Sequence, residues 1–373
     1  MPVTDTGTWN NLVSAPITLA ALGSTRASFT QILMLVASVT PGGGTIASYT
    51  TLDEVIADTA NLSAVAISMA TAIFEQGTYQ AAGVSKLYIQ GVDTGGGQTH
   101  VQALAAAIAS GADIFCIVAD SRTPATQILI ATAVETYAAS GAYYLFITQD
   151  DDADWLTTGI PSAWSAVEDY EFTAIVYHDD NANDSAATRA DCALAGNRIA
   201  WDPDVQSVAW NCNLAGVDAL TTDLTDTQRG FVDDMANAVM PFFDATSWLH
   251  PGQNLNGRQL EHIVTAAWIR RRLMEAGGNA LVAASARGTK IAVDPEGQGL
   301  LKAAFEAVAI LAVSARHLTT TDPTKPPYRV KALAITDADI TAGQLRFTFE
   351  GQFATGVRKL SIPVNLSALA LTG

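Results

Sequence analysis

With 373 residues, 49 % of them hydrophobic and 15 % charged, the chain has enough apolar material for two or three compact domains, which excludes global disorder. The net charge is −17, and residues 150–244 hold 19 acidic side chains against 3 basic ones, whereas residues 245–373 hold 14 basic and 9 acidic ones. The acidic middle argues against a nucleic-acid partner, which needs clustered lysine and arginine, and its basic neighbour suits copies that attract one another.

From Phe29 to about Trp210, short apolar runs alternate with amphipathic stretches. The predicted strands are Ile32–Val39, Lys86–Gln90, Ile114–Ala119, Tyr143–Thr148, Phe172–Tyr177 and Val205–Trp210. The predicted helices are Thr51–Ala57, Leu62–Gln76, Val101–Ser110, Pro124–Ser140 and Asp184–Asn197. Because the strands are apolar throughout, we expect a mainly parallel α/β sheet with helices on both faces.

After Gly230 the pattern changes, with predicted helices at Asp226–Phe243, Arg258–Ala276 and Pro295–His317, then a linker at Asp322–Tyr328 and predicted β structure beyond it. The second should stop at Gly277–Gly278, and the third should begin with Asp294 as its N-cap. The third helix is apolar around most of its circumference, which predicts burial in the core or at a subunit interface. No apolar run approaches the roughly 20 residues that cross a bilayer, and residues 1–9 lack the pattern of a signal peptide. We therefore expect no membrane insertion.

Both ends of the chain contain short apolar strands next to proline. Near the C-terminus the apolar side chains alternate with polar ones or proline, and they are Leu360, Ile362, Val364 and Leu366; near the N-terminus they are Ile17 and Leu19. Pro363 cannot donate a ladder hydrogen bond, so its strand belongs at the edge of a sheet. Such strands suit addition to the sheet of a neighbouring subunit. Packing of each strand against its own domain is the alternative.

Arg271 lies on the apolar stripe of the predicted Arg258–Ala276 helix. A charge on that stripe is costly unless it is paired. Arg271 is therefore a candidate interface residue that bonds a carboxylate or carbonyl across a domain or subunit boundary. The alternative is that its side chain reaches solvent at the C-terminal end of the helix.

An enzymatic hypothesis depends on three aspartates that follow predicted strands, Asp120, Asp150 and Asp179. The carboxyl ends of parallel strands meet at one edge, where such carboxylates could hold Mg²⁺ for hydrolysis. Aspartate at a strand end also caps the following helix, and no lysine or arginine accompanies the three. The histidines and glycine runs match no metal or nucleotide motif. We therefore expect no catalytic, cofactor-binding or metal-ligating residues and no cofactor, with a metal-dependent α/β hydrolase as the alternative.

Three cysteines show no metal-ligand spacing and no CxxC pair. Cys116 lies inside an apolar run, which predicts a core thiol. Cys192 and Cys212 lie in more polar sequence, so we expect free and accessible thiols, with an inter-subunit disulfide as the alternative.

Four segments in this order resemble contractile tail sheath proteins of phages and related contractile injection systems, specifically the short phage type. They are Tyr49–Thr51 leading into TLDEVIAD, the Asn256–Gly257–Arg258 turn, the helix LEHIVTAAWIRRRLMEA and the final FTFEGQFATGVRKLSIPVNL. Each motif is degenerate, and the resemblance depends on their order and spacing over the whole chain.

The resemblance implies a mainly parallel, helix-covered sheet plus an α+β assembly domain, with extended β arms at both ends. The expected division is an N-terminal arm (1–25), an α/β region (26–244) that includes the acidic middle domain (about 150–244), an assembly domain (245–343) and a C-terminal β arm (344–373).

The implied function is that of a structural subunit that polymerises helically around a tail tube and contracts to drive it through the host envelope. The partners would be identical subunits, the tail tube protein, and baseplate and tail terminator proteins. The location would be the virion tail, after assembly in the cytoplasm of the host. A different virion structural protein, such as a decoration or baseplate protein, is the remaining alternative.

Overall fold

The computed structural model describes residues 28–37, 46–77, 86–180, 184–242, 246–320 and 324–355. Within them lies a nine-stranded sheet in the order β2-β3-β1-β4-β5-β6-β8-β9-β7, in which β3 to β8 are parallel and β2, β9 and β7 run antiparallel to their neighbours. The strands are β1 (Ile32–Ala37), β2 (Ile46–Tyr49), β3 (Leu87–Val92), β4 (Cys116–Ala119), β5 (Leu145–Asp150), β6 (Thr173–Tyr177), β7 (Cys212–Asn213), β8 (Asn237–Phe242) and β9 (Thr246–His250). The predicted mainly parallel sheet is confirmed.

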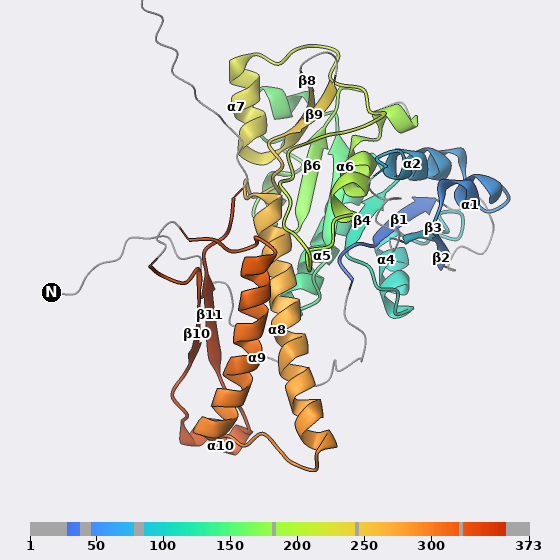
Figure 1. Cartoon of the computed structure of the whole chain (residues 1–373). Coiled ribbons are helices and arrows are strands. Elements are labelled where there is room, and N and C mark those ends of the chain that lie inside the picture. Colours follow the sequence, from blue (N-terminus) through green and yellow to red (C-terminus); the bar gives the residue numbers. More distant parts are fainter. Residues whose placement is uncertain are drawn as a thin grey trace, which may run out of the picture.

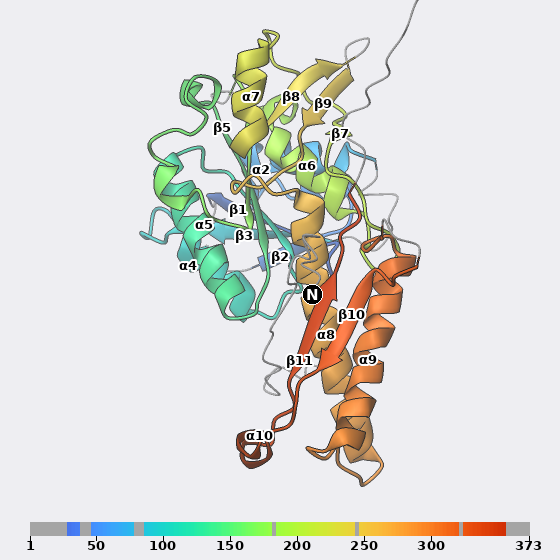
Figure 2. The ribbon, with the colours of Figure 1, turned by 90° about the vertical axis from the view of Figure 1, so that its left-hand side faces the viewer.

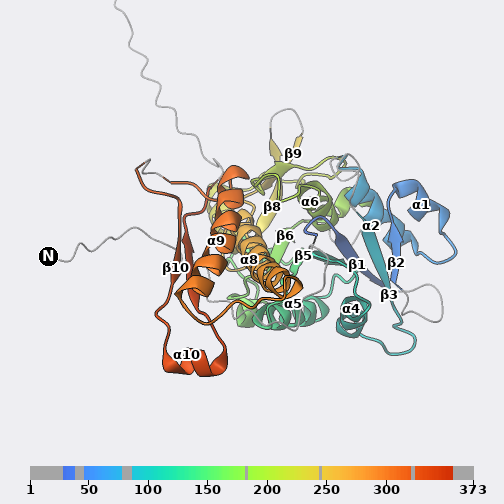
Figure 3. The ribbon, with the colours of Figure 1, turned by 60° about the horizontal axis from the view of Figure 1, so that its bottom comes forward.

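Helices cover both faces of this sheet, as the apolar strands require. They are α1 (Leu52–Ala57), α2 (Ala64–Phe74), α4 (His100–Ala109), α5 (Pro124–Ala139), α6 (Ala190–Ile199) and α7 (Asp226–Met235). Figure 3 shows α4 and α5 on one side of the sheet and α2 and α6 on the other. The contact between α2 and α6 depends on Gly196, because a Cβ there would lie 2.3 Å from the carbonyl oxygen of Ile73.

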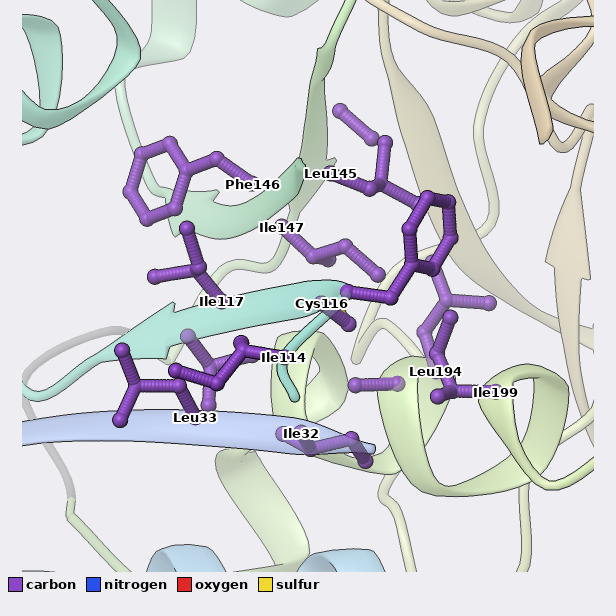
Figure 4. Packing of buried hydrophobic residues seen from close by; sticks show 14 of the residues in the cluster. Ile32, Leu33, Ile114, Cys116, Ile117, Leu145, Phe146, Ile147, Leu194 and Ile199 are labelled. Atoms are coloured by element: carbon purple, nitrogen blue, oxygen red, sulfur yellow. The ribbon is translucent and has the colours of Figure 1, made fainter. Parts of the chain in front are cut away.

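The main core fills the space between the sheet and its helices. In Figure 4 the side chain of Leu33 in β1 packs with those of Ile117 in β4 and Phe146 in β5, whereas Ile32 lies on the side where Leu194 of α6 packs. A second, smaller cluster surrounds Trp155 and Trp164 beyond β5 and β6. This cluster includes Ile175 of β6 and Ala238 of β8, so it lies against that end of the sheet, in the acidic middle of the chain.

Three sequence predictions in the α/β part are wrong or only partly right. Residues 205–210 form no strand: Val205 is 70 % exposed, and Ser207 N–H donates to the carbonyl of Ala315 instead of to a strand. Helix α7 ends at Met235, and the rest of the predicted helix is β8, which pairs with β6. Helix α6 begins only at Ala190, after a short 3₁₀ turn.

A helical hairpin extends away from the sheet (Figure 1). Helix α8 (Leu260–Ala286) runs on through Gly277 and Gly278, so the predicted stop there is wrong. Both glycines are buried in α8, which packs against α9 (Pro295–Ser314), and this packing outweighs their low helix propensity. Helix α9 begins as predicted, with Oδ1 of Asp294 accepting from Gly297 N–H at 2.8 Å.

A two-stranded antiparallel sheet of β10 (Tyr328–Ala332) and β11 (Phe347–Gly351) lies along this helical hairpin (Figure 2). The short helix α10 (Asp337–Ala342), which the sequence analysis missed, connects the two strands. Its capping box is formed by Thr336 and Asp339, and Arg346 lies 2.8 Å from the Asp339 carboxylate. These hydrogen bonds lower the pKa of Asp339 to about 2.

Among the described residues, α9 is the one helix with the length and apolar composition of a membrane span. It packs against α8 and β10, and Leu301, Phe305 and Val308 on its inner side are buried. Core helices have this composition too, so α9 does not by itself indicate a membrane protein.

Candidate assembly surfaces

The predicted catalytic aspartates lie at the carboxyl ends of β4, β5 and β6, as expected, and each has a local partner. Oδ2 of Asp120 accepts the backbone N–H of Ala37 at 2.7 Å, and its Oδ1 lies 2.7 Å from Nε2 of His100. The Asp179 carboxylate accepts the backbone N–H and the hydroxyl of Thr221. These two side chains tie neighbouring segments of the sheet edge together.

Asp150 is buried beneath two tryptophans. Its Oδ2 accepts the indole N–H of Trp155 at 3.0 Å and that of Trp164 at 2.8 Å, while Oδ1 accepts the backbone N–H of Asp151. No group of three or more potential metal ligands occurs in the part of the chain that the structure describes. The hydrolase hypothesis gains no support from this geometry.

The predicted arm residues, Ile17, Leu19, Leu360, Ile362, Val364 and Leu366, lie outside the described residues. The described chain begins at Ser28 and ends at Thr355. Over the described ranges β10 and β11 pair only with each other, so each has an open edge of backbone N–H and C=O groups. Helix α9 packs on one face of the β10–β11 sheet, where the rings of Phe305 in α9 and Phe347 in β11 have centroids 5.0 Å apart.

Arg271 lies on α8, with Nε 3.3 Å from Oε1 of Glu275 one turn on and its side chain 33 % exposed. The next residue, Arg272, reaches the α/β part: its side chain is 6 % exposed and lies 2.8 Å from the Asp204 carboxylate. Arg270 reaches it too, because its guanidinium lies over the Tyr143 ring, 5.3 Å from the centroid. Sequence reasoning missed Arg272, although its position four residues after the buried Trp268 puts both on the same face of the helix.

The outer face of α9 carries an uncharged stripe. Leu300 and Ile310 are 56 % and 59 % exposed, and Gly299, Ala303 and Ala307 are exposed on the same face at helical spacing. We call these five residues the α9 stripe. Large exposed apolar side chains that share one face are typical of interaction surfaces.

All three cysteines are free and buried. Burial raises the pKa of each thiol above its usual value. The predicted core position of Cys116 is confirmed, whereas the predicted accessibility of Cys192 and Cys212 is wrong.

No family model and no curated protein matches the sequence. Solved structures do match it. The chain is 14 % identical to a chain of the contracted sheath complex of the extracellular contractile injection system PVC, with a TM-score of 0.66 over 92 % of this chain and 93 % of that one. The chain is 15 % identical to a chain of the contracted helical sheath of the anti-feeding prophage, with a TM-score of 0.63 over 95 % of this chain and 98 % of that one. It is 13 % identical to a chain of the 6-fold symmetrised baseplate of the same prophage, with a TM-score of 0.64 over 95 % of this chain and 99 % of that one.

At these identities the likeness shows a shared fold. It covers nearly the whole of this chain and of each of the three solved chains, so the match includes the α/β part together with the helical hairpin.

Proposed function

We propose that this chain, which has the fold of contractile sheath subunits, is itself a structural subunit that polymerises helically around a tail tube and contracts to drive the tube through the host envelope. The observation that supports this most strongly is the match of the complete fold to two contracted sheaths over 92 % and 95 % of the chain. The three strand-end aspartates, which were the best case for an enzyme, serve the local structure instead.

In this proposal the chain ends act as arms that join subunits. The arm residues of one copy (Ile17 and Leu19, or Leu360 to Leu366) add to an open edge of the β10–β11 sheet in a neighbouring copy. Two features support this arrangement: the alternating apolar pattern of the arms, and a two-stranded sheet with both outer edges unpaired in the described chain. A lone two-stranded sheet is marginal in stability, and added strands would extend it.

We assign different places in the polymer to the acidic and the basic parts of the chain. The α/β region (26–244), with its acidic middle domain, packs outside an assembly region (245–343) flanked by the arms (1–25 and 344–373). Heterologous contacts between identical copies propagate as a helix instead of closing. The α9 stripe and Arg271 supply further contact surface between copies. Contraction is then a change between two lattice arrangements of the same subunit.

The other proposed partners are the tail tube protein and the baseplate and tail terminator proteins at the ends of the tail. The particle tail is the proposed location, after assembly in the cytoplasm of the producing cell. The fold match to a baseplate chain favours one second candidate, a baseplate subunit that forms a ring. Helical symmetry of the assembled polymer separates the first candidate from the second.

Negative-stain electron microscopy of the purified chain tests the proposal, with a variant that lacks residues 356–373 beside it. We expect hollow tubes from the full chain and dispersed particles from the truncated one, because the truncation removes the arm and leaves β11 intact. Closed rings without tubes would favour the baseplate candidate. Dispersed particles from both, even after a candidate tube protein is added as template, would contradict the sheath proposal.

A further inference from the structure

The N-terminal arm is rooted at Ser28 and Phe29. Ser28 N–H donates to Oδ2 of Asp113 at 2.7 Å, and the Phe29 ring packs on Phe115 with centroids 4.7 Å apart. The guanidinium of Arg272 lies over the Phe29 ring, 5.5 Å from its centroid. The point from which the N-terminal arm departs is therefore in contact with α8.

The C-terminal arm is rooted on the same helix, through residues 353–355. The Phe353 ring stacks on His262 of α8 with centroids 4.7 Å apart, and Nε2 of His262 lies 3.0 Å from the hydroxyl of Thr355. Ala354 N–H donates to the carbonyl of His317 at 2.9 Å. His262 and Arg272 are ten residues apart, which is about 15 Å along a helix.

One carboxylate, that of Asp204, lies between these two roots. It accepts two hydrogen bonds from Arg272, from Nε to Oδ1 at 2.9 Å and from Nη2 to Oδ2 at 2.8 Å. Its Oδ1 also accepts the indole N–H of Trp268 at 2.8 Å. A bidentate arginine–carboxylate pair is among the strongest and most directional contacts in proteins. Asp204 therefore holds the arginine that covers Phe29, together with Glu275, whose Oε2 accepts from Nη1 of Arg272 at 2.6 Å.

His317 continues the network from Trp268 to the C-terminal root. Its ring stacks on Trp268 with centroids 4.6 Å apart, Nε2 donates to the carbonyl of Pro203 at 2.6 Å, and Nδ1 accepts from the hydroxyl of Thr265 at 2.7 Å. The carbonyl oxygen can only accept, which places the ring proton on Nε2. The negative charge of Asp204 also acts on this ring, and the side chains of Glu261 and Arg198 line the same small cleft.

We propose that the Pro203–Asp204 turn mechanically couples the two arm roots of a subunit, through a bridge made of Asp204, Arg272, Trp268 and His317. Trp268, Arg272 and His317 are buried, so water does not compete for these contacts. The inference rests on the proposed sheath role for its purpose: a pull on one arm by a neighbour would pass through the bridge to the other arm, and so along the polymer.

The proposed coupling requires that Asp204 hold both roots at once. The two roots are far apart in sequence, yet the same carboxylate holds Arg272 on one side and Trp268 on the other. Removing the charge of Asp204 weakens its hydrogen bonds to both residues and should therefore loosen both roots together. If Asp204 served only one root, the same change would loosen that root alone. Spatial proximity alone does not establish coupling, so the test must measure both roots.

Hydrogen exchange followed by mass spectrometry on the unassembled full chain provides the test, with peptides that cover residues 28–32 and 352–355. Asp204→Asn keeps the shape and one acceptor but removes the charge. We expect exchange in both peptides to accelerate about tenfold, the scale of a lost hydrogen bond to a charged group. Asp223→Asn, at an exposed acidic position, is the matched control and should change neither peptide.

Trp268→Phe is the second variant and guards against misfolding of the first. It keeps an aromatic ring against His317 but removes the indole N–H together with part of the buried ring. The C-terminal peptide should therefore accelerate while the N-terminal peptide stays within twofold of wild type. In the double variant the effects on the C-terminal peptide should be less than additive in free energy, because both changes break the same contact.

Acceleration of only one peptide in Asp204→Asn, or of neither, would overturn the coupling, as would full additivity in the double variant. The exchange experiment uses unassembled protein, so its outcome is independent of tube formation. Coupled roots without tubes, even with a candidate tube protein as template, would support the bridge and contradict the sheath role. Tubes from a chain with uncoupled roots would support the sheath role and contradict the bridge.

Discussion

Asp150→Asn should destabilise the fold without affecting any metal binding. The carboxylate is 2 % exposed, and its Oδ2 accepts both indole N–H groups. An amide in its place has one acceptor oxygen. If that oxygen takes the place of Oδ2, both indole N–H groups bond a neutral acceptor and the NH₂ group faces the backbone N–H of Asp151; in the other orientation the NH₂ group faces both indole N–H groups. Because Trp155 and Trp164 anchor the second hydrophobic cluster, the loss should loosen that cluster first.

The expected magnitude follows from the two hydrogen bonds. A hydrogen bond to a charged group contributes about 1.5–3 kcal/mol, so weakening both should lower the free energy of unfolding by about 3 kcal/mol. Trp155→Phe and Trp164→Phe should each lower the free energy of unfolding as well, because each removes one donor and leaves a cavity at a fully buried position. Asp223→Asn, an exposed acidic position in the same region, should change the free energy of unfolding by less than about 0.5 kcal/mol.

Urea denaturation monitored by tryptophan fluorescence measures the loss, and isothermal titration with Mg²⁺ is the companion assay. We expect a lower unfolding midpoint for Asp150→Asn and no Mg²⁺ heat specific to wild type. Wild-type stability in the variant would refute the role derived from the contacts. Mg²⁺ binding that disappears in the variant would revive the hydrolase hypothesis.

Three shorter predictions test other parts of the fold. Gly196→Ala should lower the unfolding midpoint in urea because its Cβ would lie 2.3 Å from the Ile73 carbonyl oxygen. Gly230→Ala, whose Cβ would have nothing within 4 Å, should raise the free energy of unfolding by up to about 1 kcal/mol. Equal effects of the two changes would contradict the packing argument. Burial lowers the pKa of His317 below its usual 6.5, so the unfolded chain takes up the proton first and stability should fall as the pH drops below about 6.5. His317→Gln should flatten that slope in urea titrations at pH 7.5 and 5.5, and an unchanged slope would exclude this histidine as its source. Ile310→Lys on the α9 stripe should leave the urea midpoint of the unassembled chain unchanged but shorten or abolish tubes in electron micrographs, and tubes of normal length would exclude the stripe from the lattice.

Much of the α/β part was predictable because its strands are buried on both faces. A run such as Ile32–Ala37 is apolar at nearly every position, and the helices between such runs begin at capping residues such as Thr51 and Ser63. Asp294 was recognisable as an N-cap for the same reason. Local chemistry decided these elements, and the three-dimensional contacts agree with it.

The wrong predictions have tertiary causes, with one exception. The helix predicted through residue 243 contains Pro241, a signal against a helix that was overlooked, and the chain there is β8. In contrast, nothing local indicates that α8 continues through two glycines, because the packing of α8 against α9 decides it. The exposed position of Val205 follows from the adjacent Asp204, whose partners in α8 are more than 60 residues away.

The candidate site was predictable in part. The sequence pattern placed the aspartates correctly at the carboxyl ends of the strands, but whether they bind metal or indole groups depends on Trp155 and Trp164 in a following loop. Arg272 and His317 gain their significance only from the folded chain, because their partners lie in the distant 203–204 turn.

Cryo-electron microscopy with helical reconstruction of tubes formed by this chain would show directly how the subunits are joined. We expect helical symmetry and a β10–β11 sheet extended at an open edge by a strand from a different subunit, with the apolar side chains of residues 360–366 or 17–19 facing its core. A closed ring, or tubes in which both edges of β10–β11 remain bare and the arms pack on their own subunit, would contradict this arrangement.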